Sequence, residues 1–313
     1  MSQTKELTAL QRAQMFAMST RQNWHMLAKQ TTNNMPGTLQ FNLPKARLLS
    51  GLFVSIKLTG GDISSIRRLS LDLNNGFAPF VVSGEELQMY NHIDLNPLNF
   101  PAWATKEGDG ETIYNFYMPC TTNPRDPIGL ILLQNDQTNV TLNIDFGIGA
   151  TKAEVKVMTE TFSIPADVNA YPDLSVLKLV NGRSDSLPAI GQQRIQLTTG
   201  TIYRKIAIKL VDENGAPMSL DDLNGNIQLV FNQADINYSV DPEMLKMWNE
   251  KQLGAELPDG VFVFDFSNSG GLPNLGGTRD YIDSANLTEF WLEFNTAKKG
   301  KCIIVTETLA RLG

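Results

Sequence analysis

Short runs of alternating apolar and polar residues dominate the chain from Pro36 onward. In the run from Leu48 to Leu58, every second residue from Leu52 on is apolar and falls on one face. A period of two is typical of a strand that buries one face, and turn-forming residues separate the runs at close intervals. The expected strands are 38–43, 48–58, 67–73, 80–82, 112–118, 129–133, 139–146 and 153–162, followed by 194–197, 202–211, 226–231, 236–240, 261–266, 279–282, 287–294 and 301–309.

One ten-residue stretch occurs twice in related form. Val82 to Asn91 and Val240 to Asn249 share identical residues at five of the ten positions, and Tyr90 is replaced by Trp248. Each copy predicts a short helix, because Ser83 or Asp241 can cap it and Pro242 suits its first turn. We expect both helices to have a structural role, carried by Glu85, Leu87, Met89 and Tyr90 in the first and by Glu243, Leu245, Met247 and Trp248 in the second.

Further short matches keep the same order along the chain. The segment that begins at Gly37 is matched at Gly191, and Ile56-Lys57-Leu58 is repeated at 208–210. Thr159-Glu160-Thr161 is repeated at 306–308, and all the offsets lie between 147 and 158 residues. Collinear matches at nearly constant spacing indicate a duplicated domain. The predicted organisation is an N-terminal arm over 1–35, a first domain over 36–162, a connector over 163–190 and a second domain over 191–313.

The first 47 residues differ in charge from the rest. They carry six basic residues against the single acid Glu6, although the whole chain has a net charge of −7. An imperfect helical stripe runs from Leu7 to Ala28. This basic amphipathic arm could lie on anionic lipid or nucleic acid, or pack along its own domain or a neighbouring subunit. The arm residues expected to face a membrane or nucleic acid are Lys5, Arg12, Arg21, Trp24 and Lys29.

Composition and chemistry argue against several classes of protein. Apolar residues make up 42% of the chain, which favours a packed core over disorder. The absence of a long apolar run leads us to expect synthesis in a cytoplasm, with Cys120 and Cys302 as separate thiols. Two isolated histidines, His25 and His92, cannot build a metal site in each domain. We find no nucleophile motif or phosphate-binding loop, and we expect no catalytic residue, metal or cofactor.

The strand pattern predicts an all-β fold of two tandem eight-stranded jelly rolls, a double jelly roll, with an N-terminal helix and a short helix in each barrel. Eight short strands per domain with one long excursion suit a jelly roll better than an immunoglobulin-like sandwich.

Three stretches of the chain resemble one family of viral proteins. They are Pro36 to Leu43, Leu48 to Val54 and Tyr281 to Phe290. The chain is similar there to the double jelly-roll major capsid proteins of tailless, membrane-containing icosahedral bacteriophages of the tectivirus and corticovirus kind. In that family, Leu48 to Val54 would be an early strand of the first barrel.

The resemblance implies a structural protein of the virion. Three chains would form a homotrimer, a pseudo-hexameric capsomer that tiles an icosahedral shell over an internal membrane, and the N-terminal helix would lie near that membrane. Its partners would be other copies of itself, neighbouring capsomers and minor capsid or penton proteins, with no small-molecule substrate. The long segments 94–110 and 254–277 would form loops, in which Phe100, Trp103 and Leu272 are candidate interface anchors.

Two other classes of protein remain open. A phage spike, fibre or carbohydrate-binding module could also contain two jelly rolls, but it would not need a basic, Met-rich N-terminal helix. A double-barrel enzyme, either a two-domain cupin or a glycan hydrolase, is disfavoured by the few histidines and by the acidic pairs. Of Glu85-Glu86 and Asp221-Asp222, only Glu85 has a match, Glu243.

Overall fold

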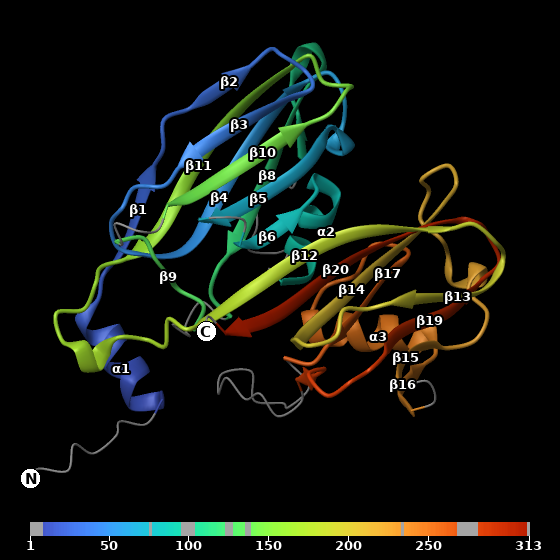
Figure 1. The fold of residues 1–313 in the computed structure, drawn as a ribbon. Coiled ribbons are helices and arrows are strands. Elements are labelled where there is room, and N and C mark those ends of the chain that lie inside the picture. The colour runs from blue at the N-terminus through green and yellow to red at the C-terminus, as the bar shows by residue number, and fades with distance from the viewer. Residues whose placement is uncertain are drawn as a thin grey trace, which may run out of the picture. The chain divides into compact units, whose positions relative to one another are not determined.

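The computed structural model describes residues 9–74, 77–94, 104–122, 128–134, 139–232, 235–267 and 281–311. The chain divides into two compact units. The first unit comprises Met1–Glu85, Ala102–Leu179 and Ala310–Gly313, and the second comprises Glu86–Pro101 and Val180–Leu309. Figure 1 labels most of the helices and strands of both units.

The first unit contains two antiparallel sheets. One has the order β1-β11-β4-β8-β7, with β2 beside β11 and β9 beside β4, and the other has the order β6-β5-β10-β3. The strands are β1 (Gln22–Met26), β2 (Gln30–Thr32), β3 (Gly37–Asn42), β4 (Leu48–Thr59), β5 (Ile66–Leu73), β6 (Phe77–Val82), β7 (Ala104–Lys106), β8 (Glu111–Pro119), β9 (Ile131–Leu132), β10 (Val140–Phe146) and β11 (Lys152–Phe162).

The second unit repeats this plan. Its sheets have the orders β17-β14-β20-β12, with β18 beside β14, and β13-β19-β15-β16. The strands are β12 (Val176–Leu187), β13 (Gly191–Gln196), β14 (Ile202–Asp212), β15 (Ile227–Phe231), β16 (Asp235–Val240), β17 (Val261–Asp265), β18 (Ile282–Asp283), β19 (Phe290–Thr296) and β20 (Gly300–Arg311). Each unit therefore contains two sheets, and each sheet is built on four principal strands.

Three α-helices accompany the strands in the described part of the chain. They are α1 (Ala9–Ser19), α2 (Gly84–Asp94) and α3 (Pro242–Leu253). Single 3₁₀ turns occur at η1 (Ile63–Ser65), η2 (Gly108–Gly110), η3 (Val168–Ala170) and η4 (Leu220–Asp222). Within the segments that the structure describes, none of the helices has the length and apolar character needed to cross a membrane.

The alternating pattern of the sequence matches the buried faces of the strands. In β4, Leu52 and Ile56 are fully buried, while Phe53 and Ser55 between them are half-buried on the opposite face. The second unit has its own apolar core, to which β14 contributes Ile206, Ile208 and Leu210. The two cysteines are free and buried, as expected.

The N-terminal arm is not one continuous helix. Helix α1 ends at Ser19, and β1 then pairs with β11, so that Trp24 lies opposite Glu160. The predicted helical stripe beyond Ser19 is therefore wrong, because the alternation from Gln22 to Met26 fits a strand and the sheet supplies backbone partners that a helix would not use.

The predicted connector 163–190 contains the twelve-residue strand β12. In the first repeat, Thr159 Oγ1 donates a hydrogen bond to the His25 carbonyl at 3.3 Å. In the second, Thr306 Oγ1 donates to the Asn181 carbonyl at 3.4 Å. Thr159 and Thr306 are matched residues of the duplication. Strand β12 is thus the counterpart of β1 and β2, and the repeating unit begins before Pro36.

Candidate interaction surfaces

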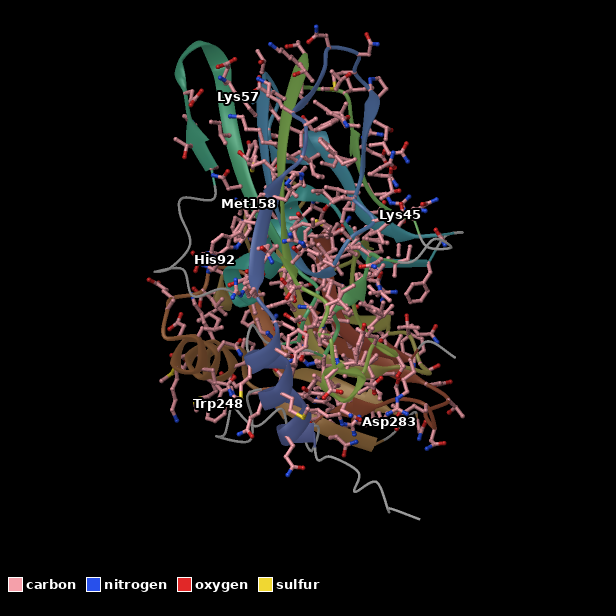
Figure 2. The ribbon with its side chains drawn as sticks, turned by 90° about the vertical axis from the view of Figure 1, so that its left-hand side faces the viewer. Lys45, Lys57, His92, Met158, Trp248 and Asp283 are labelled. Atoms are coloured by element: carbon pink, nitrogen blue, oxygen red, sulfur yellow. The ribbon has the colours of Figure 1, made fainter. Side chains whose placement is uncertain are left out.

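The outer face of the first unit's longer sheet carries an apolar surface, which we call the β1–β11 face. It consists of the side chains that point away from the barrel core on β1, β11, β4 and β8, and Figure 2 labels Met158 at its centre. Cross-strand pairing aligns Met26 with Met158, Met158 with Phe53, and Phe53 with Tyr117. The members of the face are Trp24, Met26, Gly51, Phe53, Tyr117, Met158 and Glu160.

Two side chains of this face are widely exposed. Trp24 is 64% exposed and Met26 is 55% exposed, while Phe53, Tyr117 and Met158 are half-buried. Single exposed apolar residues are common on proteins, but a contiguous apolar patch marks an interaction surface.

Tyr117 and Glu160 give the β1–β11 face a polar centre. The Tyr117 ring lies 4.4 Å from the Phe53 ring, centroid to centroid, and its hydroxyl donates to Glu160 Oε2 at 2.7 Å. The ring lies directly over Gly51, where an added Cβ would come within 2.7 Å of the Tyr117 hydroxyl oxygen. Glycine at position 51 therefore permits this placement of the ring. Gln22 Nε2 also donates to Glu160.

The aromatic side chain of Phe16 packs helix α1 on the first unit. Phe16 is buried in a small cluster with Leu48 and Leu130, and its ring meets the Phe162 ring edge-on at 5.4 Å. Helix α1 therefore packs on its own domain, which is one of the arrangements expected from the sequence. The opposite side leaves Met18 89% exposed.

The basic residues predicted to face a membrane or nucleic acid have different environments. Arg12 and Arg21 are exposed. Lys29 forms a salt bridge to Glu154 at 2.7 Å, which lowers the pKa of that carboxyl. Lys5 lies outside the described residues.

The first repeated helix is buried along most of its length. Leu87, Met89 and Tyr90 are all less than a tenth exposed, and Glu85 is half-buried. From Glu86 onward the helix belongs to the second unit. There, the Glu86 carboxylate lies over Gly182 of β12, so closely that a Cβ at that glycine would overlap with it.

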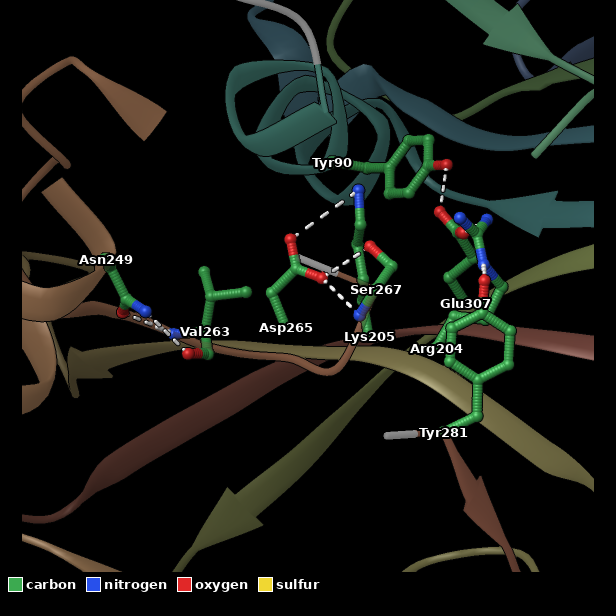
Figure 3. A network of polar contacts seen from close by, with 9 residues as sticks. All are labelled: Tyr90, Arg204, Lys205, Asn249, Val263, Asp265, Ser267, Tyr281 and Glu307. Carbon is green, nitrogen blue, oxygen red and sulfur yellow. Dashed lines mark hydrogen bonds and ion pairs between the residues drawn. The ribbon is translucent and has the colours of Figure 1, made fainter. Parts of the chain in front are cut away.

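Tyr90 leads into a buried polar network in the second unit (Figure 3). Its hydroxyl donates to Glu307 Oε2 at 2.5 Å, and Arg204 Nη1 forms a salt bridge with Glu307 Oε1. Arg204 Nε donates to the Tyr281 hydroxyl at 3.0 Å. Burial disfavours the charged form of Arg204, but Glu307 and Tyr281 outweigh that effect and hold its pKa above the usual value.

The second repeated helix begins as the sequence predicts. Asp241 Oδ1 accepts hydrogen bonds from the backbone N–H of Glu243 and Met244, and Pro242 occupies the first turn. Leu245 is buried in the core of the second unit, while Glu243 is exposed.

The outer side of α3 remains open. Met244, Met247 and Trp248 are 59%, 57% and 48% exposed. We call these three residues the α3 face. Two of them, Met244 and Trp248, line a groove of about 400 Å³ with Tyr238 and with Phe264 and Phe266. Lys251 Nζ lies 5.0 Å from the centre of the Trp248 ring, in a cation–π contact.

Asn249 fixes α3 to the edge strand β17. Its amide Nδ2 donates to the Val263 carbonyl at 2.7 Å, and its Oδ1 accepts from the Val263 N–H at 2.9 Å. Asn249 and its counterpart Asn91 are both almost completely buried. We did not single out this asparagine from the sequence, although its identity in both copies of the repeat was a usable signal.

No group of three or more potential metal ligands occurs among the residues that the structure describes. His25 is exposed in β1, and His92 is half-buried in the last turn of α2. The surfaces above instead carry exposed apolar side chains, which are suited to contact with another macromolecule.

Comparison with known proteins identifies similarity in structure alone. No protein-family model matches the chain, and none of the curated proteins does. The PBCV-1 virus capsid matches with a TM-score of 0.70 and 8% identity, over 93% of this chain and 94% of that one.

Two further solved structures give a similar result. The MCP of STIV, Sulfolobus turreted icosahedral virus, matches with a TM-score of 0.68 and 14% identity, over 93% of this chain and 97% of that one. The major capsid protein of bacteriophage PM2 matches with a TM-score of 0.64 and 11% identity, over 94% and 98%. The chain is similar to these capsid proteins from end to end, and it has their double jelly-roll fold.

Proposed function

We propose that this chain is a viral major capsid protein with a structural rather than a catalytic role in the virion. The observation that carries the proposal is the double jelly-roll match over more than nine-tenths of both chains in each of three viral capsid structures. The exposed apolar β1–β11 and α3 faces support it, because a shell subunit needs lateral contact surfaces.

We further propose that three chains form a pseudo-hexameric capsomer. Two similar barrels per chain, arranged about a threefold axis, place six similar blocks around a ring. Such a capsomer can make near-sixfold lateral contacts with identical neighbours and with the proteins that occupy the vertices of an icosahedral shell.

Electron microscopy of the purified protein tests this proposal. We expect compact discs with six lobes, and sheets or closed particles made from them at higher protein concentration. Single particles of one chain, with no lobed assembly at any concentration, would contradict it.

We also propose that helix α1 contacts the inner membrane of the virion. Arg12 and Arg21 are exposed together with Met18, which combines positive charge with an apolar side chain in a short segment. Wild-type protein should co-sediment with vesicles that contain anionic lipid and should bind neutral vesicles less. A variant with Gln at positions 12, 18 and 21 should lose this binding, whereas a variant with Gln at exposed Ile148 should keep it. Equal binding by all three proteins would contradict the proposed contact of α1 with the membrane.

A further inference from the structure

The two repeats bury the same surfaces to different extents. In the second unit, the outer face of β12, β14 and β20 is closed, and Val180, Ala207 and Val305 are at most 3% exposed. Cross-strand pairing identifies the counterparts of two of these residues, because Val305 lies opposite Ala207 as its match Met158 lies opposite Phe53. Trp24 takes the place of Val180, because Thr159 bonds to the next residue, His25, as Thr306 bonds to Asn181. Trp24, Phe53 and Met158 all belong to the β1–β11 face. This face is open, with Trp24 64% exposed.

Helix α2 covers part of the closed face. Glu86 lies over Gly182 of β12, and Tyr90 donates to Glu307 of β20. The side of α2 that carries Glu86 and Tyr90 therefore lies against this sheet, and Met89 on the same side of the helix is also buried.

On α3, the side that corresponds to this side of α2 is the α3 face. Met244, Met247 and Trp248 occupy the positions of Glu86, Met89 and Tyr90 in the repeat. All three residues are about half exposed or more, whereas their counterparts in α2 are buried. Among the residues that the structure describes, the α3 face is therefore exposed where its counterpart on α2 is buried, and the β1–β11 face is more exposed than its counterpart on β12, β14 and β20.

We propose that the α3 face of one chain docks on the β1–β11 face of a second copy, as α2 docks on β12 and β20 within the chain. This inference rests on the proposed function and names the residues of its lateral contact. Met244 would then lie beside Met26, whose side chain stands where Gly182 has none, so α3 would lie farther from the sheet than α2 does. Trp248 would lie beside Glu160, the counterpart of Glu307.

The chemistry of the two faces supports this pairing. Met26, Trp24 and Met158 present apolar side chains to the two methionines of the α3 face. Methionine packs well on irregular apolar surfaces. Glu307 is neutralised by Arg204 within its unit, and Lys251 beside Trp248 would bring a cation toward Glu160 in the same way.

The contact is heterologous, because the surface offered differs from the surface received. Each chain has one of each, so a rotation that closes produces a ring. One α3 face and one β1–β11 face in each chain are therefore enough to close the ring.

Cysteine cross-linking tests the pairing. Met26→Cys and Met244→Cys chains, each with a different tag, are co-expressed, and the purified protein is treated with a short bis-maleimide. The native Cys120 and Cys302 are buried and should not react in the folded protein. We expect a product of two chains that carries both tags, and none from either variant expressed alone. A matched pair, Ile148→Cys and Ile190→Cys, is exposed but lies outside both faces and should give no product.

The possible outcomes separate the inference from the proposed function. A trimer that gives no cross-link between positions 26 and 244 would overturn the pairing and leave the capsid proposal standing. Cross-linking of either variant with itself would also overturn it, because that result requires an isologous contact. A protein that stays monomeric at all concentrations would overturn both.

A second measurement does not depend on cysteine geometry. Trp248→Ala should weaken self-association by about 30-fold or more, as expected for an aromatic anchor at the centre of an interface. Ile190→Ala, at a similarly exposed position, should change it less than threefold, and equal effects of the two variants would contradict the pairing.

Discussion

The Tyr90 hydroxyl donates a hydrogen bond to Glu307 Oε2 across 2.5 Å, in a site where both residues are almost completely buried. The bond links a helix of the first repeat to the last strand of the second. Its two residues are separated by 217 positions in the sequence. Both residues belong to the second unit, so the contact forms only once these distant segments of the sequence have come together.

Removal of the Tyr90 hydroxyl should destabilise the protein measurably. Tyr90→Phe leaves one buried acceptor oxygen of Glu307 without this donor, at an expected cost of about 1–3 kcal/mol in the free energy of unfolding. Urea unfolding followed by circular dichroism measures this loss. Tyr117→Phe serves as the matched control, since Glu160 is only half-buried and water can replace the hydroxyl there. An equal loss in both variants would contradict the importance of burial.

Removing one partner of the Arg204–Glu307 ion pair should destabilise the protein more than replacing both partners by apolar residues. Arg204→Met leaves a buried carboxylate without its cation and should lower the free energy of unfolding by about 3–5 kcal/mol. Arg204→Met combined with Glu307→Met removes both charges and should recover most of that loss. Strictly additive losses in the double variant would show that the two residues do not interact as the structure describes.

Asn249→Ala should loosen the attachment of α3 to β17. The substitution leaves the buried N–H and carbonyl of Val263 without their side-chain partners, at an expected cost of about 2–4 kcal/mol. Hydrogen exchange of the Val263 amide should accelerate along with the loss of stability. Asn226→Ala removes an exposed hydrogen bond to Ser239 at 2.9 Å and should have little effect on either quantity.

Because the two thiols are buried, we expect the free energy of unfolding to decrease at alkaline pH. Burial raises the pKa of the Cys120 thiol to about 12 and also raises the pKa of Cys302. An unfolded cysteine has a pKa of about 8.5, so the unfolded chain loses its thiol protons first as the pH rises. The stabilising contribution is complete below about pH 8.5 and decreases above it, toward the higher pKa of the folded state.

Two measurements check this prediction. The free energy of unfolding should be lower at about pH 10 than at about pH 8, with a smaller difference in Cys120→Ala. A thiol-specific dye should label neither cysteine in the native protein and both after denaturation. Rapid labelling of the native protein at neutral pH would contradict the burial of these thiols.

The sequence predicts a strand well where it buries a single face, as β10 does. The alternation in Leu48 to Leu58 is a local signal, and the structure confirms it as β4. The repeat in the sequence corresponds to the two matched barrels. Capping of α3 by Asp241 is equally local and is confirmed. A cap at Ser83 stays a prediction.

The errors occur where a strand depends on its partner. Strands β1 and β12 lie in polar or mixed sequence, and their backbone groups find partners only when β11 and β20 are present. The different burial of Tyr90 and Trp248 could not be read from their similar surroundings in the sequence. It depends on which sheet each helix meets after folding.

The proposed assembly is tested most directly by the mass of the protein in solution. Light scattering across a range of concentrations should give about 104 kDa, three times the 34.7 kDa of one chain, as expected for a closed cyclic trimer. Trp248→Ala should shift this mass toward that of one chain upon dilution, ahead of the wild-type protein. A wild-type mass of 34.7 kDa at every concentration would contradict the account.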